Sequence, residues 1–182
     1  MRKLHIVTSQ RLKWACQAVK AELKQHGIWL EPVSKVPVRI ALVGTCYGWQ
    51  EYGTTGEIRI PKLSLCRVRD WYLNRYTSLR EVLRHEYGHA VAYCYPRLIR
   101  SRRFRRAFGL PHDSTQTLDF MPGFHVTEYS AVSPAEDFAE LFMLFLGRSG
   151  RLPEYLATPP IRRKWRFIQH LCRAIKTGSR TL

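Results

Sequence analysis

The segment EVLRHEYGHAVAYCYP contains two histidines four residues apart, His85 and His89, with a glutamate directly after the first. Ser78 and Glu81 form the S-x-x-E pattern of a capping box, and the proline that ends the segment cannot continue a helix. This pattern predicts a helix over 78–95. Residues i and i+4 of a helix lie on one face, so both imidazoles can reach the same metal ion.

The order His85-Glu86-x-x-His89 is the HExxH pattern of zinc hydrolases. Zinc accepts imidazole nitrogen and prefers four ligands in a tetrahedron. Glu86 is rotated about a quarter turn from His85, which places it beside the metal as a general base toward a water that the metal acidifies. The alternative interpretation is a helix whose histidines are only solvated or hydrogen-bonded.

A catalytic zinc usually has three protein ligands and one open position. The segment AVAYCYPRLIRSRRF directly after His89 contains no His, Asp or Glu. The third ligand must therefore come from further along the chain, where the candidates are His112, Asp113, Asp119, His125, Glu128, Glu136, Asp137 and Glu140.

Ser133 and the proline after it predict a helix over 134–147 that is apolar almost all round and therefore buried. Glu136 and Glu140 lie on one stripe of this helix, where unpaired carboxylates are costly. Glu136 is thus the preferred third ligand. Two alternatives stay open: Glu136 serves only as the capping-box partner of Ser133, or His125 on the preceding loop is the ligand instead.

The motifs HEYGHAV and EYSAVSPAEDFAELF, within 77–147, resemble the gluzincin metallopeptidases of the anthrax lethal factor protease-domain type. The resemblance implies a zinc peptidase that cuts protein or peptide substrates, an endopeptidase rather than an exopeptidase. It implies that one zinc ion is held by His85, His89 and Glu136, with Glu86 as general base. Tyr129 would stabilise the oxyanion and Glu140 would orient a ligand histidine, although Tyr129 also fits an ordinary core or surface tyrosine.

The expected fold class is α+β, with a zincin-like architecture implied by the resemblance. Alternating apolar residues predict strands near 38–42 and 57–61, the latter at an edge because it ends in Pro61, and a loop over 45–56. An edge strand is what such peptidases use to hold an extended substrate. We expect one domain over 1–182, made of a helix and small mixed sheet (1–76), the HExxH helix (78–95), an arginine-rich insertion (97–120), the glutamate-bearing helix (134–147) and a C-terminal helix (158–176).

Thirty Lys and Arg against fourteen Asp and Glu give a net charge of +16, which favours anionic partners such as nucleic acid or acidic proteins. A candidate patch for such a partner is formed by Arg97, Arg100, Arg102, Arg103, Arg105 and Arg106. The same residues fit a merely solvated face. An alternative function is therefore a basic nucleic-acid-binding or other non-catalytic binding protein, with structural zinc or none.

The five cysteines form no CxxC pair, which favours reduced, mostly buried thiols over a disulfide framework or zinc ribbon. The N-terminus lacks the apolar run of a signal peptide, and the longest apolar stretch, LFMLFLG, is too short to cross a bilayer. These features predict a cytoplasmic protein without a transmembrane segment.

Overall fold

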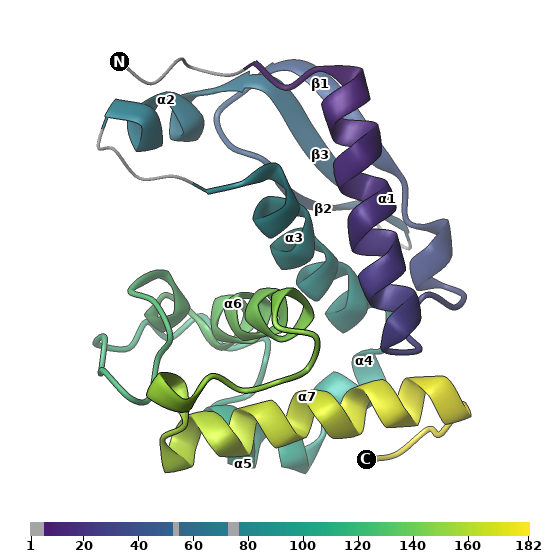
Figure 1. Cartoon of the computed structure of the whole chain (residues 1–182). Helices are drawn as coiled ribbons and strands as arrows, with labels where there is room; N and C mark the ends of the chain where they lie inside the picture. Colours follow the sequence, from purple (N-terminus) through teal and green to yellow (C-terminus); the bar gives the residue numbers. More distant parts are fainter. Residues whose placement is uncertain (1–5, 53–54, 73–76) are drawn as a thin grey trace.

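Helix α3 (Leu79–Cys94) runs through the middle of the protein, with the sheet and α1 (Ser9–Gln25) on one side and α6 (Pro134–Gly147) on the other (Figure 1). The computed structural model describes residues 6–52, 55–72 and 77–182. The expected α+β class is confirmed. Because α3 contacts both parts of the chain, its two faces determine how the whole protein is assembled.

Three strands form a mixed sheet in the order β1-β3-β2. β1 (Val38–Gly44) is parallel to β3 (Thr55–Ser64), while β2 (Gly48–Tyr52) is antiparallel to it. The predicted mixed sheet is therefore present, but the loop expected over 45–56 is wrong in its middle, where β2 forms. The glycines and threonines around β2 indicate a loop, but Trp49 and Tyr52 favour a strand, and pairing with β3 supplies the remaining stability.

The prediction that the strand ending in Pro61 lies at an edge is also wrong, because β3 is the central strand. The pairing with β2 ends at Arg59, however, so Pro61 has a neighbour only in β1, at Ala41. A proline is tolerated there because its missing N–H faces no strand on the β2 side.

The predicted start of α3 is confirmed by its capping box. The Ser78 hydroxyl accepts a hydrogen bond from the Glu81 N–H at 3.2 Å, and the Glu81 carboxylate accepts from the Ser78 N–H at 2.8 Å. Thr8 caps α1, whose buried face carries Leu12, Ala15, Val19 and Leu23. The capping box sets where α3 begins, and so sets which of its residues face α6.

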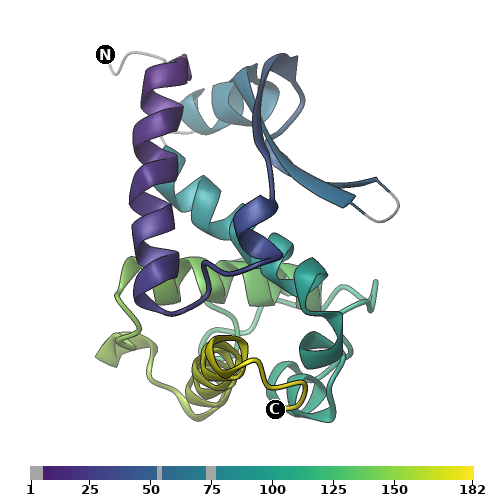
Figure 2. The same ribbon diagram turned by 90° about the vertical axis from the view of Figure 1, so that its right-hand side faces the viewer.

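The second part of the chain is helical. It contains α4 (Pro96–Ile99), α5 (Arg102–Phe108), α6 and α7 (Pro159–Thr177), together with short 3-10 turns at Tyr129–Ala131 and Glu154–Leu156. Figure 2 shows α7 end-on, below α6. The segment expected as an arginine-rich insertion contributes to the core, because edge-on and stacked ring contacts join Phe104, Phe108, Phe138, Phe142 and Phe167.

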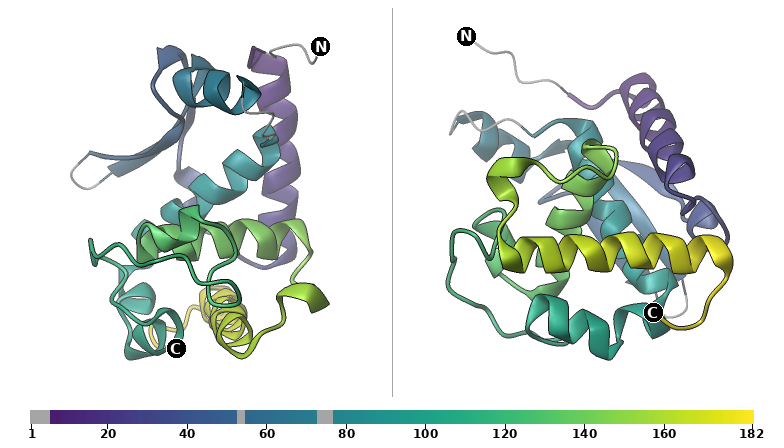
Figure 3. Two further views of the ribbon diagram at one scale, coloured as in Figure 1. Left: turned by 90° about the vertical axis from the view of Figure 1, so that its left-hand side faces the viewer. Right: turned by 60° about the horizontal axis from the view of Figure 1, so that its bottom comes forward.

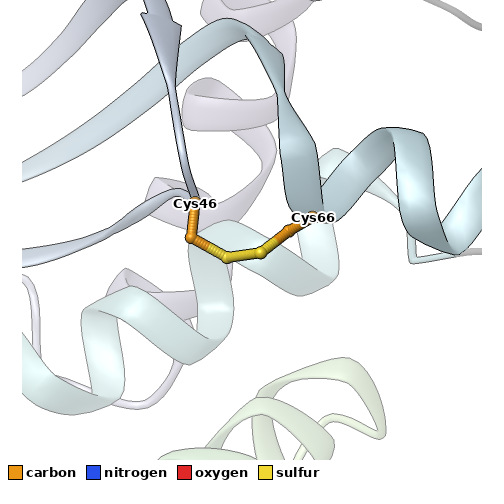
Figure 4. The surroundings of a disulfide bond; sticks show 2 residues. All are labelled: Cys46 and Cys66. Atoms are coloured by element: carbon orange, nitrogen blue, oxygen red, sulfur yellow. A yellow bond between two sulfur atoms is a disulfide. The ribbon is translucent and has the colours of Figure 1, made fainter.

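A disulfide joins Cys46 to Cys66, with their Cα atoms 5.4 Å apart (Figure 4). The prediction that the thiols are reduced is wrong for this pair, although Cys16, Cys94 and Cys172 are free. The cause is the parallel pairing of β1 with β3, which sets Gly44 opposite Ser64 and brings the cysteine two residues after each of them together. α2 (Leu65–Tyr72) is thereby tied to the end of β1.

Reduced cysteines were one reason to expect a cytoplasmic protein, and the disulfide contradicts that reason. Cytoplasmic localisation therefore stays a prediction. Within the described ranges, no helix combines the length and apolar character needed to cross a bilayer.

Glu22 joins α1 to α3 by accepting hydrogen bonds from two arginines on α3. Its carboxylate lies 2.7 Å from Arg80 Nη2, and 2.8 and 2.7 Å from Arg84 Nε and Nη2. The side chains of Glu22 and Arg84 are 15% and 14% exposed, so solvent screens this pair only in part. This contact fixes the rotation of α3 about its own axis, and it lies on the side of α3 that faces α1.

A buried ion pair joins α6 to α7. Lys164 Nζ is fully buried and lies 2.6 Å from both Asp137 Oδ2 and the carbonyl oxygen of Phe124. Burial raises the pKa of Asp137 to about 6, against the opposing effect of the Lys164 ammonium. Lys164 thus holds α7, α6 and the loop before α6 in one arrangement.

Replacing Lys164 by Met should therefore destabilise the protein by about 3–5 kcal/mol at pH 7, because Asp137 is left buried without a cation. The measurement is the free energy of unfolding from urea titration, with Lys13→Met as the control, since Lys13 is exposed on α1. A loss no larger than the control's, about 0.5 kcal/mol at most, would show that the pair contributes nothing.

Candidate metal centre

Helices α3 and α6 bring three potential ligand atoms together. His85 Nε2 and His89 Nε2 lie 3.1 Å apart, and Glu136 Oε2 lies 3.1 Å from the former and 3.3 Å from the latter. In the described part of the chain, these three residues are the group of His, Cys, Asp or Glu side chains close enough to hold a metal ion together. The cluster can bind a metal, and it joins the three ligands predicted from the sequence.

The cluster is partly open to solvent. The side chains of His85, His89 and Glu136 are 12%, 15% and 19% exposed. A metal site that is closed by protein on all sides is usually structural, whereas a partly exposed one leaves a position for water or substrate.

Glu140 orients His85. Its Oε1 lies 2.8 Å from His85 Nδ1, so the ring donates its Nδ1 proton to this carboxylate and directs Nε2 toward Glu136. The other oxygen, Oε2, accepts a hydrogen bond from Thr127 Oγ1 at 2.8 Å. The role predicted for Glu140 agrees with this geometry. Thr127 was not identified from the sequence, because an isolated threonine in a loop carries no pattern.

The cluster favours a positive charge. Burial opposes a charge on His85, but the neighbouring Glu136 and Glu140 carboxylates outweigh it and raise the pKa of the ring to about 10. Burial likewise acts against the charged form of Glu136, yet the two histidines lower its pKa to about 2. Glu136 Oε2 is itself buried without a well-aligned hydrogen-bond donor. A metal cation would meet the same demand as a proton.

Glu136 takes part in the cap of α6 through its backbone N–H, not through its carboxylate. Ser133 Oγ accepts a hydrogen bond from the Glu136 N–H at 3.2 Å, but the Glu136 carboxylate lies against the two histidines. The rival ligand, His125, is buried elsewhere, where its Nδ1 accepts from the Met121 N–H at 3.1 Å. The histidine therefore stabilises the loop before α6.

The remaining candidates lie outside the cluster. Asp137 is paired with Lys164, whereas Asp113, Asp119 and Glu128 are exposed. His112 packs between the rings of Phe104 and Phe138, and burial lowers its pKa to about 4, so it is neutral at pH 7.

Glu86 is 5% exposed and lies beside the two histidines without being one of the three ligands. Burial raises its pKa, while His85, His89 and a hydrogen bond from the backbone N–H of Trp49 act in the opposite direction. Trp49 belongs to β2, so the edge of the sheet reaches the cluster. The sequence did not identify Trp49, because its segment was predicted to be a loop.

The ring of Tyr129 lies next to the cluster, with its centroid 5.9 Å from that of His85. Burial and the neighbouring carboxylates, Glu136 above all, raise the pKa of its hydroxyl, which therefore stays protonated. The side chain is nevertheless half exposed. Thr127 positions this turn, since its Oγ1 also accepts from the Ser130 N–H at 3.1 Å.

The six arginines of the predicted patch lie on α4, α5 and the residues next to them, and all are exposed. They lie on helices outside the cluster and supply no ligand to it.

Gly88 allows α3 and α6 to approach closely enough for the cluster to form. A Cβ added to Gly88 would lie 3.0 Å from Ala139 Cα and 3.3 Å from Ala139 Cβ. Both helices carry small residues at this crossing: Gly88 precedes His89 directly, and Ala139 lies about one turn after Glu136. Any larger side chain must push α6, and Glu136 with it, away from the histidines.

Gly88→Val should lower metal affinity by about tenfold or more, since overpacking costs about 1–3 kcal/mol and is relieved by moving α6. Gly48→Val is the matched control, because a Cβ at Gly48 meets nothing within 4 Å. The measurement is metal affinity by competition with a chromogenic chelator. Equal affinities for the two variants would contradict this role for Gly88.

Glu140→Gln should weaken metal binding roughly 10–100-fold, because it only loosens the ring of His85. Glu136→Ala should weaken it by more, because it removes a ligand. Metal content and affinity, measured by elemental analysis and chelator competition, provide the test. Glu154→Ala is the control, because Glu154 is exposed in a 3-10 turn. Unchanged affinity in Glu136→Ala would exclude Glu136 as a ligand.

The chain matches no protein-family model, no curated protein and no solved structure. The resemblance to gluzincins therefore stays a prediction, and the functional argument rests on the site itself.

Proposed function

We propose that the protein is a zinc-dependent peptidase, an endopeptidase that hydrolyses peptide bonds in protein or peptide substrates. The observation that carries the proposal is the convergence of His85 Nε2, His89 Nε2 and Glu136 Oε2 beside a fourth residue, Glu86, that is buried and is not a ligand. A ligand set with an adjacent carboxylate is what metal-assisted hydrolysis requires.

The spacing of the ligand atoms supports zinc. Tetrahedral zinc with bonds of about 2.0–2.1 Å has ligands roughly 3.3 Å apart. The three distances here, 3.1, 3.1 and 3.3 Å, are close to that value. Two imidazoles and one carboxylate also form a ligand set of catalytic zinc sites, in which a fourth position remains open. A bound zinc ion would supply Lewis acidity, polarising the scissile carbonyl and lowering the pKa of a water molecule.

Glu86 would act as the proton carrier. Its raised pKa makes its carboxylate a better base than a solvated glutamate. It would accept a proton from the attacking water and deliver it to the nitrogen of the leaving amine. The hydrogen bond from the Trp49 N–H holds one side of the carboxylate in place during this transfer.

Tyr129 would donate a hydrogen bond to the oxyanion. Its hydroxyl is protonated at neutral pH and lies on a turn that Thr127 connects to Glu140. A donor that is held in place before the reaction stabilises negative charge without reorganising, which is the property an oxyanion donor needs.

The edge strand β2 would hold the substrate. Among the described residues it pairs with β3 only, and its Trp49 reaches Glu86. An extended peptide placed along the free side of β2 would bind through main-chain hydrogen bonds, with its ends free to continue in both directions. This arrangement favours an endopeptidase, and it assigns to β2 the role that the sequence suggested for the strand at 57–61.

Glu86→Gln should lower hydrolysis by about 10²–10⁴-fold while the protein still binds one zinc ion, because the amide cannot accept the proton. New N-termini in a peptide library, counted by mass spectrometry, measure hydrolysis, and elemental analysis measures zinc. Glu154→Gln is the control and should cut at the wild-type rate. Cleavage by Glu86→Gln at the wild-type rate would exclude the assignment.

A further inference from the structure

Helices α5 and α7 lie side by side at the end of the protein opposite the sheet (Figures 1 and 3). Their outer surface and that of the adjoining α4 are basic. We call this surface the α5–α7 face and define it by its exposed cations, which are Arg97, Arg100, Arg102, Arg103, Arg105, Arg106, Arg162, Arg163, Arg166, Arg173 and Lys176. The face extends the arginine patch predicted from 97–106 by a second helix that is distant in sequence.

The charge of this face is almost uncompensated. Neither 96–108 nor 159–177 contains an Asp or Glu. Among the residues that the structure describes, Arg100 is the only cation of the face with an ion pair, to Asp113 at 3.7 Å. The two helices also act on one residue of the face, His170 on α7, whose pKa is lowered. Burial, and then Arg173 on α7 and Arg103 on α5, lower this pKa.

The chemistry of the face fits phosphate. Ten of its eleven cations are arginines, whose planar guanidinium groups bind phosphate through two hydrogen bonds at once. A membrane-binding surface needs exposed apolar side chains to enter the lipid. Among the described residues, no large hydrophobic residue of 96–108 or 159–177 is exposed.

The side chains of the face and the length of its stripe of cations favour a duplex over a single strand. Proteins that bind single strands stack the bases on exposed aromatic rings. Here the aromatic residues of both helices, Phe104, Phe108, Trp165 and Phe167, are buried. Four exposed cations of α7 fall on one stripe that rises about 21 Å along the helix, namely Arg162, Arg166, Arg173 and Lys176. That length matches roughly six base pairs of one phosphate strand.

We propose that the α5–α7 face binds the sugar-phosphate backbone of double-stranded nucleic acid without reading its sequence. α6 lies between this face and α3, so a bound duplex leaves the metal centre free (Figure 1). Binding does not depend on the proposed peptidase activity. If that activity is present, the face brings the metal centre to proteins located on nucleic acid.

The test uses labelled duplexes of roughly 20 base pairs, one DNA and one RNA of mixed sequence, titrated with the full chain between about 50 and 200 mM salt. The variant carries Arg103→Gln, Arg166→Gln and Arg173→Gln. The control carries Arg11→Gln, Lys13→Gln and Lys24→Gln, which remove the same charge from exposed positions on α1. Wild-type protein should bind both duplexes, and the comparison of the two identifies which source of phosphate is preferred.

Each lost phosphate contact should reduce the slope of log affinity against log salt by about 0.9, so the face variant should lose about 2.7 and bind more than tenfold more weakly. The α1 control should retain the wild-type slope. Thermal unfolding and metal content should be unchanged in both, because every substituted side chain is exposed.

Four outcomes would overturn the proposal. They are the absence of duplex binding at low salt, equal loss in the face variant and the α1 control, tighter binding to a single strand of the same length, and binding to vesicles of phosphatidylserine and phosphatidylcholine without binding to duplex.

Discussion

The close contact between Gly88 on α3 and Ala139 on α6 is the constraint on which the rest of the site depends. Without a side chain at Gly88, the two helices approach until the Glu136 carboxylate lies within 3.3 Å of both ring nitrogens. The motif therefore does more than supply ligands, since one of its two unspecified positions is the residue that admits the third ligand. Close-packed interiors have little free volume, so an added side chain at Gly88 can be accommodated only by moving α6.

The helices are held at this contact from both sides. Glu22 binds Arg84 from α1, while Lys164 binds Asp137 from α7. Each interaction involves the residue next to a cluster ligand, so the rotation of each ligand-bearing helix is set within one residue of the site. Glu140 binds the ring of His85 through one oxygen and Thr127 through the other. Thr127 belongs to the turn that carries Tyr129, so this turn is held in place relative to His85. These contacts hold the side chains of the cluster in place, which limits the reorganisation that metal binding requires.

The predictions succeeded where the relevant pattern is local. The capping box of Ser78 and Glu81, the helical spacing of His85 and His89, and the cap at Ser133 are all expressed within one turn of helix, and all are present. The sequence favours Glu136 because the site needs a third ligand and a buried carboxylate needs a partner, and the structure places it against both histidines. The predictions failed where two segments had to meet. Neither β2 nor the Cys46–Cys66 disulfide has a local pattern, because both result from where β3 lies.

The sequence by itself determined the elements and the chemistry they carry: a capped helix with two imidazoles and a base, a buried helix with two carboxylates, and an excess of arginine. Only the tertiary structure places the Glu136 carboxylate against both ring Nε2 atoms and the Glu140 carboxylate against His85 Nδ1, because the crossing with α3 sets what each side chain meets. It also decided that the arginines of 97–106 and those of α7 form one face. Both outcomes depend on contacts between segments far apart in the chain, and these arise from packing, which no local pattern encodes.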